Sequence, residues 1–362
     1  MKIFLKLDWI LVVSVLLLLC VGLVTLYSMS SFDSAAGLNH FEKQLTSIGI
    51  GIFLLLLFSF FDYRILNSYS TKLYFFILII LSLLIFFGTT IRGTTGWIGF
   101  GPFNIQPVEM AKVIIVIFLA SFLSKKKSYF SVVLRTIVSI ILVLIPVMLI
   151  LKQPDFGSAA IIMAIWVGML FASGINKKVI FGLVFVGIIA TTSGWFMLKD
   201  YQKDRLVNFV SPDNDPRGTG YNVIQSIVAV GSGGMWGKGL GHGSQSQLNF
   251  LPEKHTDFIF AVFSEELGFF GSGVILGLFG LLIYRIKETA RLARDNFGYL
   301  LAVGVIVMLF FQVLVNVGMN IGVAPVAGVP LPFLSYGGSS MISVLASIGI
   351  IQSIYIRRVK VS

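Results

Sequence analysis

Ten apolar segments, nearly free of charged residues, follow one another along this chain. A helix that crosses a membrane needs about 20 mostly apolar residues, within a range of about 17–25. Unpaired backbone is not tolerated at lipid depth, so even the shorter segments are expected to be helical. The pattern predicts an all-α integral membrane protein with about ten transmembrane helices, in a single polytopic domain over residues 1–362. The segments are 9–28, 45–61, 72–88, 108–123, 130–151, 157–173, 178–198, 258–284, 298–321 and 338–356.

The composition excludes an ordinary soluble protein. Only 12% of the residues are charged and 56% are hydrophobic, whereas a soluble domain carries about 25% charged residues. The first apolar segment is too long for a signal peptide and no small-residue cleavage site follows it, so we expect it to be retained as a span. The single cysteine, Cys20, lies in that segment and allows no intrachain disulfide.

The basic residues indicate how the chain is oriented in the membrane. If the amino terminus is cytoplasmic, most of the 27 Lys and Arg residues fall on the inner side, as the positive-inside rule requires. The short outer loops then hold only Lys43, Arg92 and Lys152. Both termini are therefore predicted to be cytoplasmic. The net charge of +11 is a topology signal that favours contact with anionic lipid over nucleic acid.

One long polar segment, 199–257, is predicted to form a large extracytoplasmic loop, and loops of this length are usually functional. Its glycine-rich part, GSGGMWGKGLGHGSQ (231–245), does not fit a Walker nucleotide-binding loop. That loop needs Gly where this chain has Ser232, and Ser or Thr where it has Gly239. We therefore expect a flexible outer loop, whose backbone N–H groups are available to a lipid-linked phosphate.

Ionisable residues in the spans lie in the outer half of the membrane. Each costs about 2.5–3.5 kcal/mol to insert and is a functional candidate by default. Glu109 and Lys112 share a face at the outer start of the fourth helix. Asp155 begins the sixth helix and Asp257 the eighth, with Glu265 expected roughly 12 Å deeper on the same face. The arrangement predicts one site that is open to the outside.

Each of these residues also has a structural interpretation. Glu109 and Lys112 are then a buried ion pair that fixes helix packing, and Asp155 is a helix cap, a role that is also open to Asp257. Glu265 hydrogen-bonds a neighbouring helix. The three histidines are not paired at metal-ligand spacing, which disfavours a zinc site.

Five stretches of the chain resemble the SEDS (shape, elongation, division, sporulation) family, and its rod-shape members more than its division members. The resemblance extends from about residue 92 to 345. It departs from the family at Gly96, where relatives often carry a basic residue. The stretches are QPVEMAK (106–112), KQPDFGSA (152–159), YQKDRLVNFVSPDNDPRGTGYNVIQS (201–226), GSGGMWGKGLGHGSQSQLNFLPEKHTDFIFAVFSEELG (231–268) and GVPLPFLSYGGSS (328–340).

The resemblance implies a peptidoglycan glycosyltransferase of the bacterial cytoplasmic membrane with about ten helices. Such an enzyme polymerises lipid II at the outer face during cell elongation, with a class B penicillin-binding protein as its crosslinking partner. The family's essential acid corresponds to Asp257 in KHTDFIF. Its other functionally important positions correspond to Glu109, Lys112, Asp155 and Arg205.

The corresponding mechanism is a single inverting displacement. Asp257 acts as general base on the acceptor 4-hydroxyl, while Lys112, Arg205 and Lys254 stabilise the leaving pyrophosphate and Glu109 positions Lys112. No cofactor is required, although a divalent cation held by one of the acids stays open. The alternatives are a lipid II flippase and a non-catalytic scaffold. Flippases typically show inverted repeats and midplane sites, and this sequence shows neither.

Overall fold

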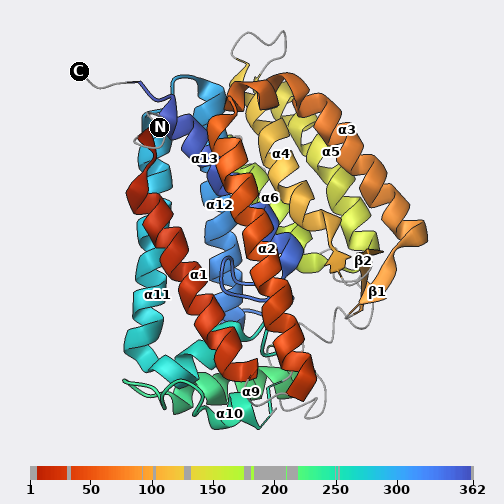
Figure 1. Cartoon of the computed structure of the whole chain (residues 1–362). Helices are drawn as coiled ribbons and strands as arrows, with labels where there is room; N and C mark the ends of the chain where they lie inside the picture. Colours follow the sequence, from red (N-terminus) through yellow and green to blue (C-terminus); the bar gives the residue numbers. More distant parts are fainter. Residues whose placement is uncertain are drawn as a thin grey trace.

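The computed structural model describes residues 6–30, 34–91, 93–100, 103–125, 132–174, 181–182, 209, 219–248, 250–251 and 253–359. These residues form a bundle of long helices with a short helical layer across one end (Figure 1). The helices are α1 (Trp9–Ser30), α2 (Ser34–Phe60), α3 (Tyr63–Phe87), α4 (Pro107–Ser124), α5 (Val132–Lys152), α6 (Phe156–Ala172), α9 (Thr219–Ser232), α10 (Ser244–Gln247), α11 (Ile259–Arg291), α12 (Asn296–Asn320) and α13 (Gly338–Ile356).

Eight of the described helices are long and apolar enough to cross a membrane: α1 to α5, α11, α12 and α13. The shorter α6 is also apolar, so nine of the ten predicted segments are confirmed as apolar helices. The remaining segment, 178–198, lies outside the described residues except for 181–182, and most of the first half of the predicted loop 199–257 also lies outside them.

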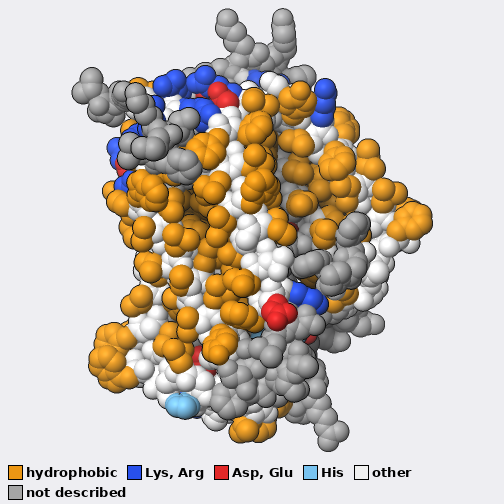
Figure 2. All heavy atoms as spheres, viewed as in Figure 1, with side chains coloured by type: hydrophobic (Ala, Val, Ile, Leu, Met, Phe, Trp, Pro, Cys, Tyr) orange, Lys and Arg blue, Asp and Glu red, His pale blue; other side chains and the backbone are white. Residues whose placement is uncertain are grey.

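The helices divide into a central and a peripheral group. In the apolar windows of α4 and α13, 72% and 78% of the residues are buried, against 22% for α11. The central α4 and α12 pack against α6, and α13 packs along α2. Large apolar side chains of the peripheral helices face outward and cover the sides of the bundle in a broad band (Figure 2). This is the surface expected of helices that contact lipid.

The two ends of the bundle differ in charge. Helix α1 begins and α13 ends at the same end (Figure 1), and most of the visible Lys and Arg side chains gather there (Figure 2). The positive-inside rule assigns this end to the cytoplasm. The layer that contains α9 and α10 then lies at the outer face, in agreement with the predicted orientation.

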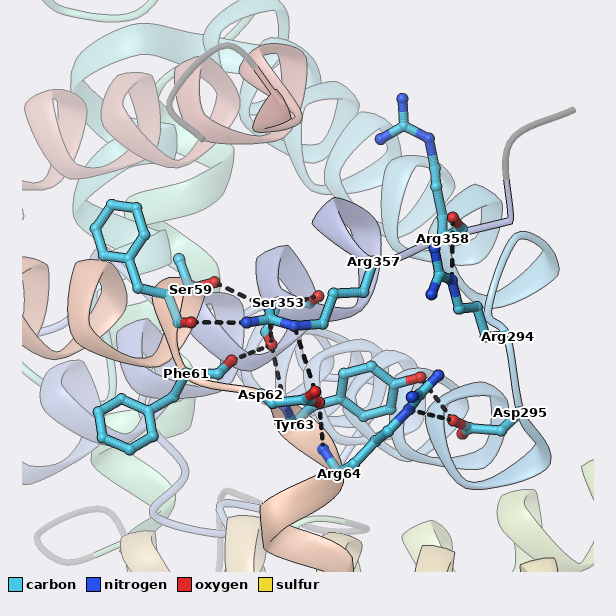
Figure 3. A network of polar contacts seen from close by, with 11 residues as sticks. Ser59, Phe61, Asp62, Tyr63, Arg64, Arg294, Asp295, Ser353, Arg357 and Arg358 are labelled. Carbon is cyan, nitrogen blue, oxygen red and sulfur yellow. Dashed lines mark hydrogen bonds and ion pairs between the residues drawn. The ribbon is translucent and has the colours of Figure 1, made fainter. Parts of the chain in front are cut away.

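A polar network joins three helices at the cytoplasmic end (Figure 3). The Arg357 guanidinium, just beyond α13, lies 3.6 Å from Asp62, which caps α3. The Asp295 carboxylate, which caps α12, accepts hydrogen bonds from Tyr63 Oη at 2.8 Å and from Arg64 Nε at 3.2 Å. Basic residues at this end therefore join helices as well as setting the topology.

The described residues are mostly helical, as predicted, and a small sheet between α3 and α4 adds three short strands. Strands β1 (Thr89–Ile91), β2 (Thr94–Phe100) and β3 (Phe103–Ile105) are antiparallel, with Thr89 opposite Trp97 and Ile98 opposite Ile105. The predicted spans leave 92–103 between the third and fourth helices, as one of the outer loops. The Thr, Trp, Ile and Phe residues between the glycines of this segment favour strands, and pairing between neighbouring strands stabilises them.

Helix α11 bends sharply at Gly268, where φ is 66° and ψ is −164°. The nine residues before the bend stay at the outer end of the bundle, and the longer part after it runs past α1 to the cytoplasmic end (Figure 1). Glu266 accepts a hydrogen bond from Ser28, in the last turns of α1. The bend follows Glu265 in the chain, so it changes the course of the helix only beyond that residue, and the depth of Glu265 relative to Asp257 stays a prediction.

We expect Gly268→Ala to destabilise the protein by about 1–3 kcal/mol, since only glycine adopts this φ without strain. A Cβ at Gly268 would also lie 2.3 Å from the backbone nitrogen of Gly237. The matched variant is Gly273→Ala in the same helix, where nothing lies within 4 Å of a new Cβ. That variant should be neutral or slightly stabilising. Thermal unfolding of the purified protein in detergent measures both, and equal melting temperatures would contradict this expectation.

Candidate active site

A pocket near the outer end of the bundle collects residues from six parts of the chain. They come from the sheet, the start of α4, the turn before α6, the segment before α11, the connection between α12 and α13, and the first turn of α13. Asp155 and Asp257 both line it, as the sequence predicted. Sequence reasoning did not single out the other polar and aromatic side chains in its wall, which include Thr94, Trp97, Gln106, Thr256, Tyr336, Ser339 and Ser340.

Asp257 is held in place through its backbone by two asparagines of α12. The side-chain amides of Asn316 and Asn320 each donate to the Asp257 carbonyl oxygen at 3.0 Å. Both asparagines are fully buried. The Asp257 carboxylate lies beside Gly328, since a Cβ on that glycine would be 3.8 Å from Asp257 Oδ2. The backbone is thus fixed while the partly exposed side chain lines the pocket.

The spacing of the two asparagines is the signal that would have identified them. Amide side chains four residues apart in an otherwise apolar helix share one face. Polar groups on such a face are expected to find a partner inside the bundle rather than in lipid.

The connection between α12 and α13 forms one wall of the pocket and enters the bundle without forming a helix. A Cβ on Gly22, midway along α1, would lie 2.9 Å from the Phe333 carbonyl oxygen. Phe333 has a φ of 66°, a strained value for a bulky residue. Irregular backbone at membrane depth is tolerated where it is buried in protein or lines a cavity. This segment does both.

Hydrogen bonds tie that connection to the segment that carries Asp257. Ser335 Oγ donates to the Thr256 carbonyl at 2.6 Å and accepts from the Leu331 backbone N–H at 2.7 Å. The Tyr336 N–H donates to the His255 carbonyl at 2.8 Å. The two residues before Asp257 are therefore hydrogen-bonded, through their carbonyls, to the connection that forms the pocket wall.

Asp155 both caps α6 and lines the pocket. Its Oδ1 accepts a hydrogen bond from the Ser158 N–H at 2.9 Å, which confirms the capping interpretation. Burial raises the pKa of the Asp155 carboxyl, against the opposing effects of the Ser158 hydrogen bonds and the charge of Lys112. Capping and a pocket position are thus compatible roles for one side chain.

Asp155 should make stability depend on pH. Because its pKa is higher in the folded than in the unfolded protein, its stabilising contribution is complete below the ordinary aspartate pKa and is lost as pH rises through the raised value. Asparagine is an equally good helix cap but does not titrate. We therefore expect the melting temperature of Asp155→Asn to rise relative to that of wild type as pH increases from the ordinary aspartate pKa to the raised pKa of Asp155 in the folded protein. Parallel curves for the two proteins would contradict this expectation.

Glu109 and Lys112 form a buried ion pair below the pocket. Lys112 Nζ lies 2.7 Å from Glu109 Oε1, and the side chains are 1% and 3% exposed. Neither residue lines the pocket, because this face of α4 packs within the core. The ion-pair interpretation is confirmed. Direct contact of either residue with substrate stays a prediction, and it requires a change in this packing.

Of the other two predicted cations, only Lys254 is described, and it does not line the described pocket wall. Lys254 is buried, and its ammonium donates to the Ser246 carbonyl at 3.0 Å. Arg205 lies outside the described residues. Lys254 therefore helps to fold the outer segment in this structure, and a contact with pyrophosphate stays a prediction for both residues.

Glu265 and Glu266 organise the glycine-rich segment. The Glu265 carboxylate accepts from Lys238 Nζ at 2.8 Å and from the backbone N–H groups of Gln245 and Ser246 at 2.9 and 3.0 Å. The Glu266 carboxylate accepts from the Gly241 N–H. The prediction that this segment is a flexible loop is therefore wrong. Both carboxylates have a structural role. They accept most of their hydrogen bonds from the glycine-rich segment, and Ser28 of α1 is the donor from a neighbouring helix.

A divalent cation stays a prediction. Within the described ranges, no group of three or more His, Cys, Asp or Glu side chains could hold a metal ion. Asp155 and Asp257 nevertheless supply two carboxylates to the pocket wall, and carboxylate oxygens are the ligands that Mg²⁺ prefers.

Known proteins are similar to this chain in sequence. The peptidoglycan glycosyltransferase MrdB of Escherichia coli K12 is 37% identical over 345 residues, which cover 94% of this chain and 93% of MrdB. Stage V sporulation protein E of Bacillus subtilis is 37% identical over 358 residues, covering 96% of both chains.

Two solved structures are also similar. A chain of a peptidoglycan synthase complex that coordinates polymerization and crosslinking gives a TM-score of 0.82 at 31% identity, covering 96% of this chain and 97% of that one. The rod shape determining protein RodA of Thermus thermophilus gives 0.73 at 29% identity, covering 98% of each.

A family model described as "Cell cycle protein", for FtsW, RodA and SpoVE, matches residues 8–360. The match includes every segment that forms the pocket, and it confirms the resemblance seen in the sequence. This protein therefore belongs to the FtsW, RodA and SpoVE family of cell cycle proteins.

Proposed function

We propose that this protein is a peptidoglycan glycosyltransferase that polymerises lipid II at the outer face of the bacterial cytoplasmic membrane during cell elongation. The observation that carries the proposal is the pocket around Asp257, at the end of the bundle opposite the Lys- and Arg-rich end. Relatives that cover almost the whole chain are named peptidoglycan glycosyltransferases.

In the proposed reaction, Asp257 accepts the proton of the acceptor 4-hydroxyl as that oxygen bonds to the anomeric carbon of the donor. The bond from that carbon to the pyrophosphate breaks, and the pyrophosphate leaves with the electron pair. One displacement inverts an α donor into a β linkage. Because Asn316 and Asn320 fix the backbone of Asp257, the base is oriented before the substrate arrives.

The departing pyrophosphate needs stabilising charge, and the described pocket wall contains no Lys or Arg. The first turn of α13 opens on the pocket through Gly338, Ser339 and Ser340, and N–H groups at a helix start favour anions. We propose that these groups act together with Arg205. Lys112 acts at longer range, through its charge on Asp155.

We propose a class B penicillin-binding protein of the elongation machinery as the crosslinking partner. The similar chain in the solved synthase complex supports this, because a polymerase and a crosslinking enzyme act on the same strand. The proposal includes no nucleic acid, since the basic residues are concentrated at the cytoplasmic end of a membrane-spanning bundle.

The test is to reconstitute the purified chain in liposomes with lipid II, with and without the partner, and to resolve the products on a gel. Glycan strands are the expected result. Movement of lipid II across the bilayer without polymer would support a flippase, and neither activity would support a scaffold.

A further inference from the structure

The first half of α2 contacts the wall of the Asp257 pocket through Gln44. This side chain is buried and makes two hydrogen bonds to the segment just before α13. Its Nε2 donates to the Ser335 carbonyl at 3.1 Å, and its Oε1 accepts from the Gly337 N–H at 3.2 Å. One amide therefore fixes two backbone groups, one on each side of Tyr336, which lines the pocket.

One helical turn earlier, His40 packs between the two segments that form the site. Its ring stacks on that of His255, with the centroids 5.3 Å apart and the planes at 21°. It also meets the Tyr336 ring edge-on, at 4.7 Å and 84°. His255 is two residues before Asp257, and its carbonyl accepts the Tyr336 N–H. A single α2 side chain thus contacts the segment that carries Asp257 and the segment that carries Tyr336.

These contacts continue to the proposed base itself. Ser335, whose carbonyl is held by Gln44, donates its hydroxyl to the Thr256 carbonyl, next to Asp257. In contrast, the Asp257 carbonyl is held by α12. Asn316 also holds the Val329 carbonyl of the connection. Loss of the α2 contacts would therefore leave Asp257 and the base of the connection attached to α12, but the Tyr336 ring and the Gly337 backbone would lose their support from α2 and shift relative to the Asp257 carboxylate.

We propose that Gln44 and His40 are positioning residues for glycosyl transfer. Helix α2 sets the distance between the Asp257 carboxylate and the wall that faces it, and so sets the alignment of the two sugars. The inference rests on the proposed function, and it assigns to α2 a role beyond membrane anchoring. Neither residue was singled out as functional by the sequence or by the family resemblance.

The first experiment compares Gln44→Leu with Thr46→Val. Leucine has a similar size but makes no hydrogen bond, whereas Thr46 is exposed on the same helix. Misplacement by about 1 Å costs about 100-fold in rate, so we expect kcat of Gln44→Leu for lipid II polymerisation to fall by about that factor, with little change in KM. Thr46→Val should match wild type. Unchanged kcat per folded molecule in Gln44→Leu, even with a lower melting temperature, would overturn the proposal.

The second experiment keeps the proposal testable if Gln44→Leu does not fold. His40→Phe retains an aromatic ring between His255 and Tyr336, and His40→Ala removes it. We expect the Phe variant to keep most of the wild-type kcat and the Ala variant to lose it. Equal kcat in the two variants would overturn the positioning role.

If wild type itself formed no polymer, the proposed function would fail and this inference with it. If wild type polymerises lipid II and Asp257→Ala does not, the proposed function holds, and the α2 variants then test only the positioning role.

Discussion

Replacing Asp257 by asparagine should abolish glycan polymerisation by the purified protein while leaving its fold intact. Asparagine has nearly the same shape but does not accept the acceptor's proton at neutral pH. A general base contributes about 10²–10⁴ in rate, and we expect a loss of this size in kcat. The fold should survive because α12 holds Asp257 through its backbone carbonyl, which the substitution keeps. Strand formation from lipid II and the melting temperature measure the two expectations.

The matched variant is Glu42→Gln, since Glu42 is an exposed acid on α2. It carries the same change from carboxylate to amide and should polymerise lipid II like wild type. Asp257→Ala should be as inactive as Asp257→Asn. Full activity in either Asp257 variant would remove the assignment of the general base, whatever its effect on stability.

The second large effect concerns the buried ion pair of α4. Lys112→Met should destabilise the protein by about 3–5 kcal/mol, because it leaves Glu109 charged and unpaired in the core. Both side chains are almost fully buried, so water cannot take the place of the lost ammonium. We expect a lower melting temperature and a large loss of folded protein, and thermal unfolding together with the yield from membranes measures both.

The double variant Glu109→Leu, Lys112→Met separates stability from function. Apolar replacement of a whole buried pair is often neutral or stabilising, so the melting temperature should recover. We expect polymerisation to stay low, because Lys112 also acts through its charge on Asp155 in the pocket wall. Normal polymerisation by the double variant would show that the pair serves only the fold.

The sequence was sufficient to predict the membrane helices because length and apolarity are local properties. The predicted segment 338–356 coincides with α13 and 298–321 with α12, each within two residues. The bend at Gly268 was not predictable in the same way. It depends on backbone hydrogen bonds from Phe269 and Phe270 to the carbonyls of Gly234 and Met235, which lie far away in the sequence.

The site was predicted in part. Order along the chain showed which charged residues lie near the outer face, and Asp155 and Asp257 do meet in one pocket. It did not show which way each side chain points. Lys112 and Lys254 point into the protein because Glu109 and the Ser246 carbonyl hold them there. Their partners depend on packing between helices, which a single sequence does not encode locally.

The late position of the pocket wall in the chain affects how the enzyme is made. The ribosome delivers Asp257 to the membrane well before Gly328, Tyr336 and the start of α13. A nascent chain that has inserted only α1 to α11 carries the aspartate but lacks the wall that faces it. Since α13 is the most buried of the candidate spans, the earlier helices lack a central packing partner until it has inserted. We therefore expect sugar transfer through this pocket to begin only after α13 has inserted.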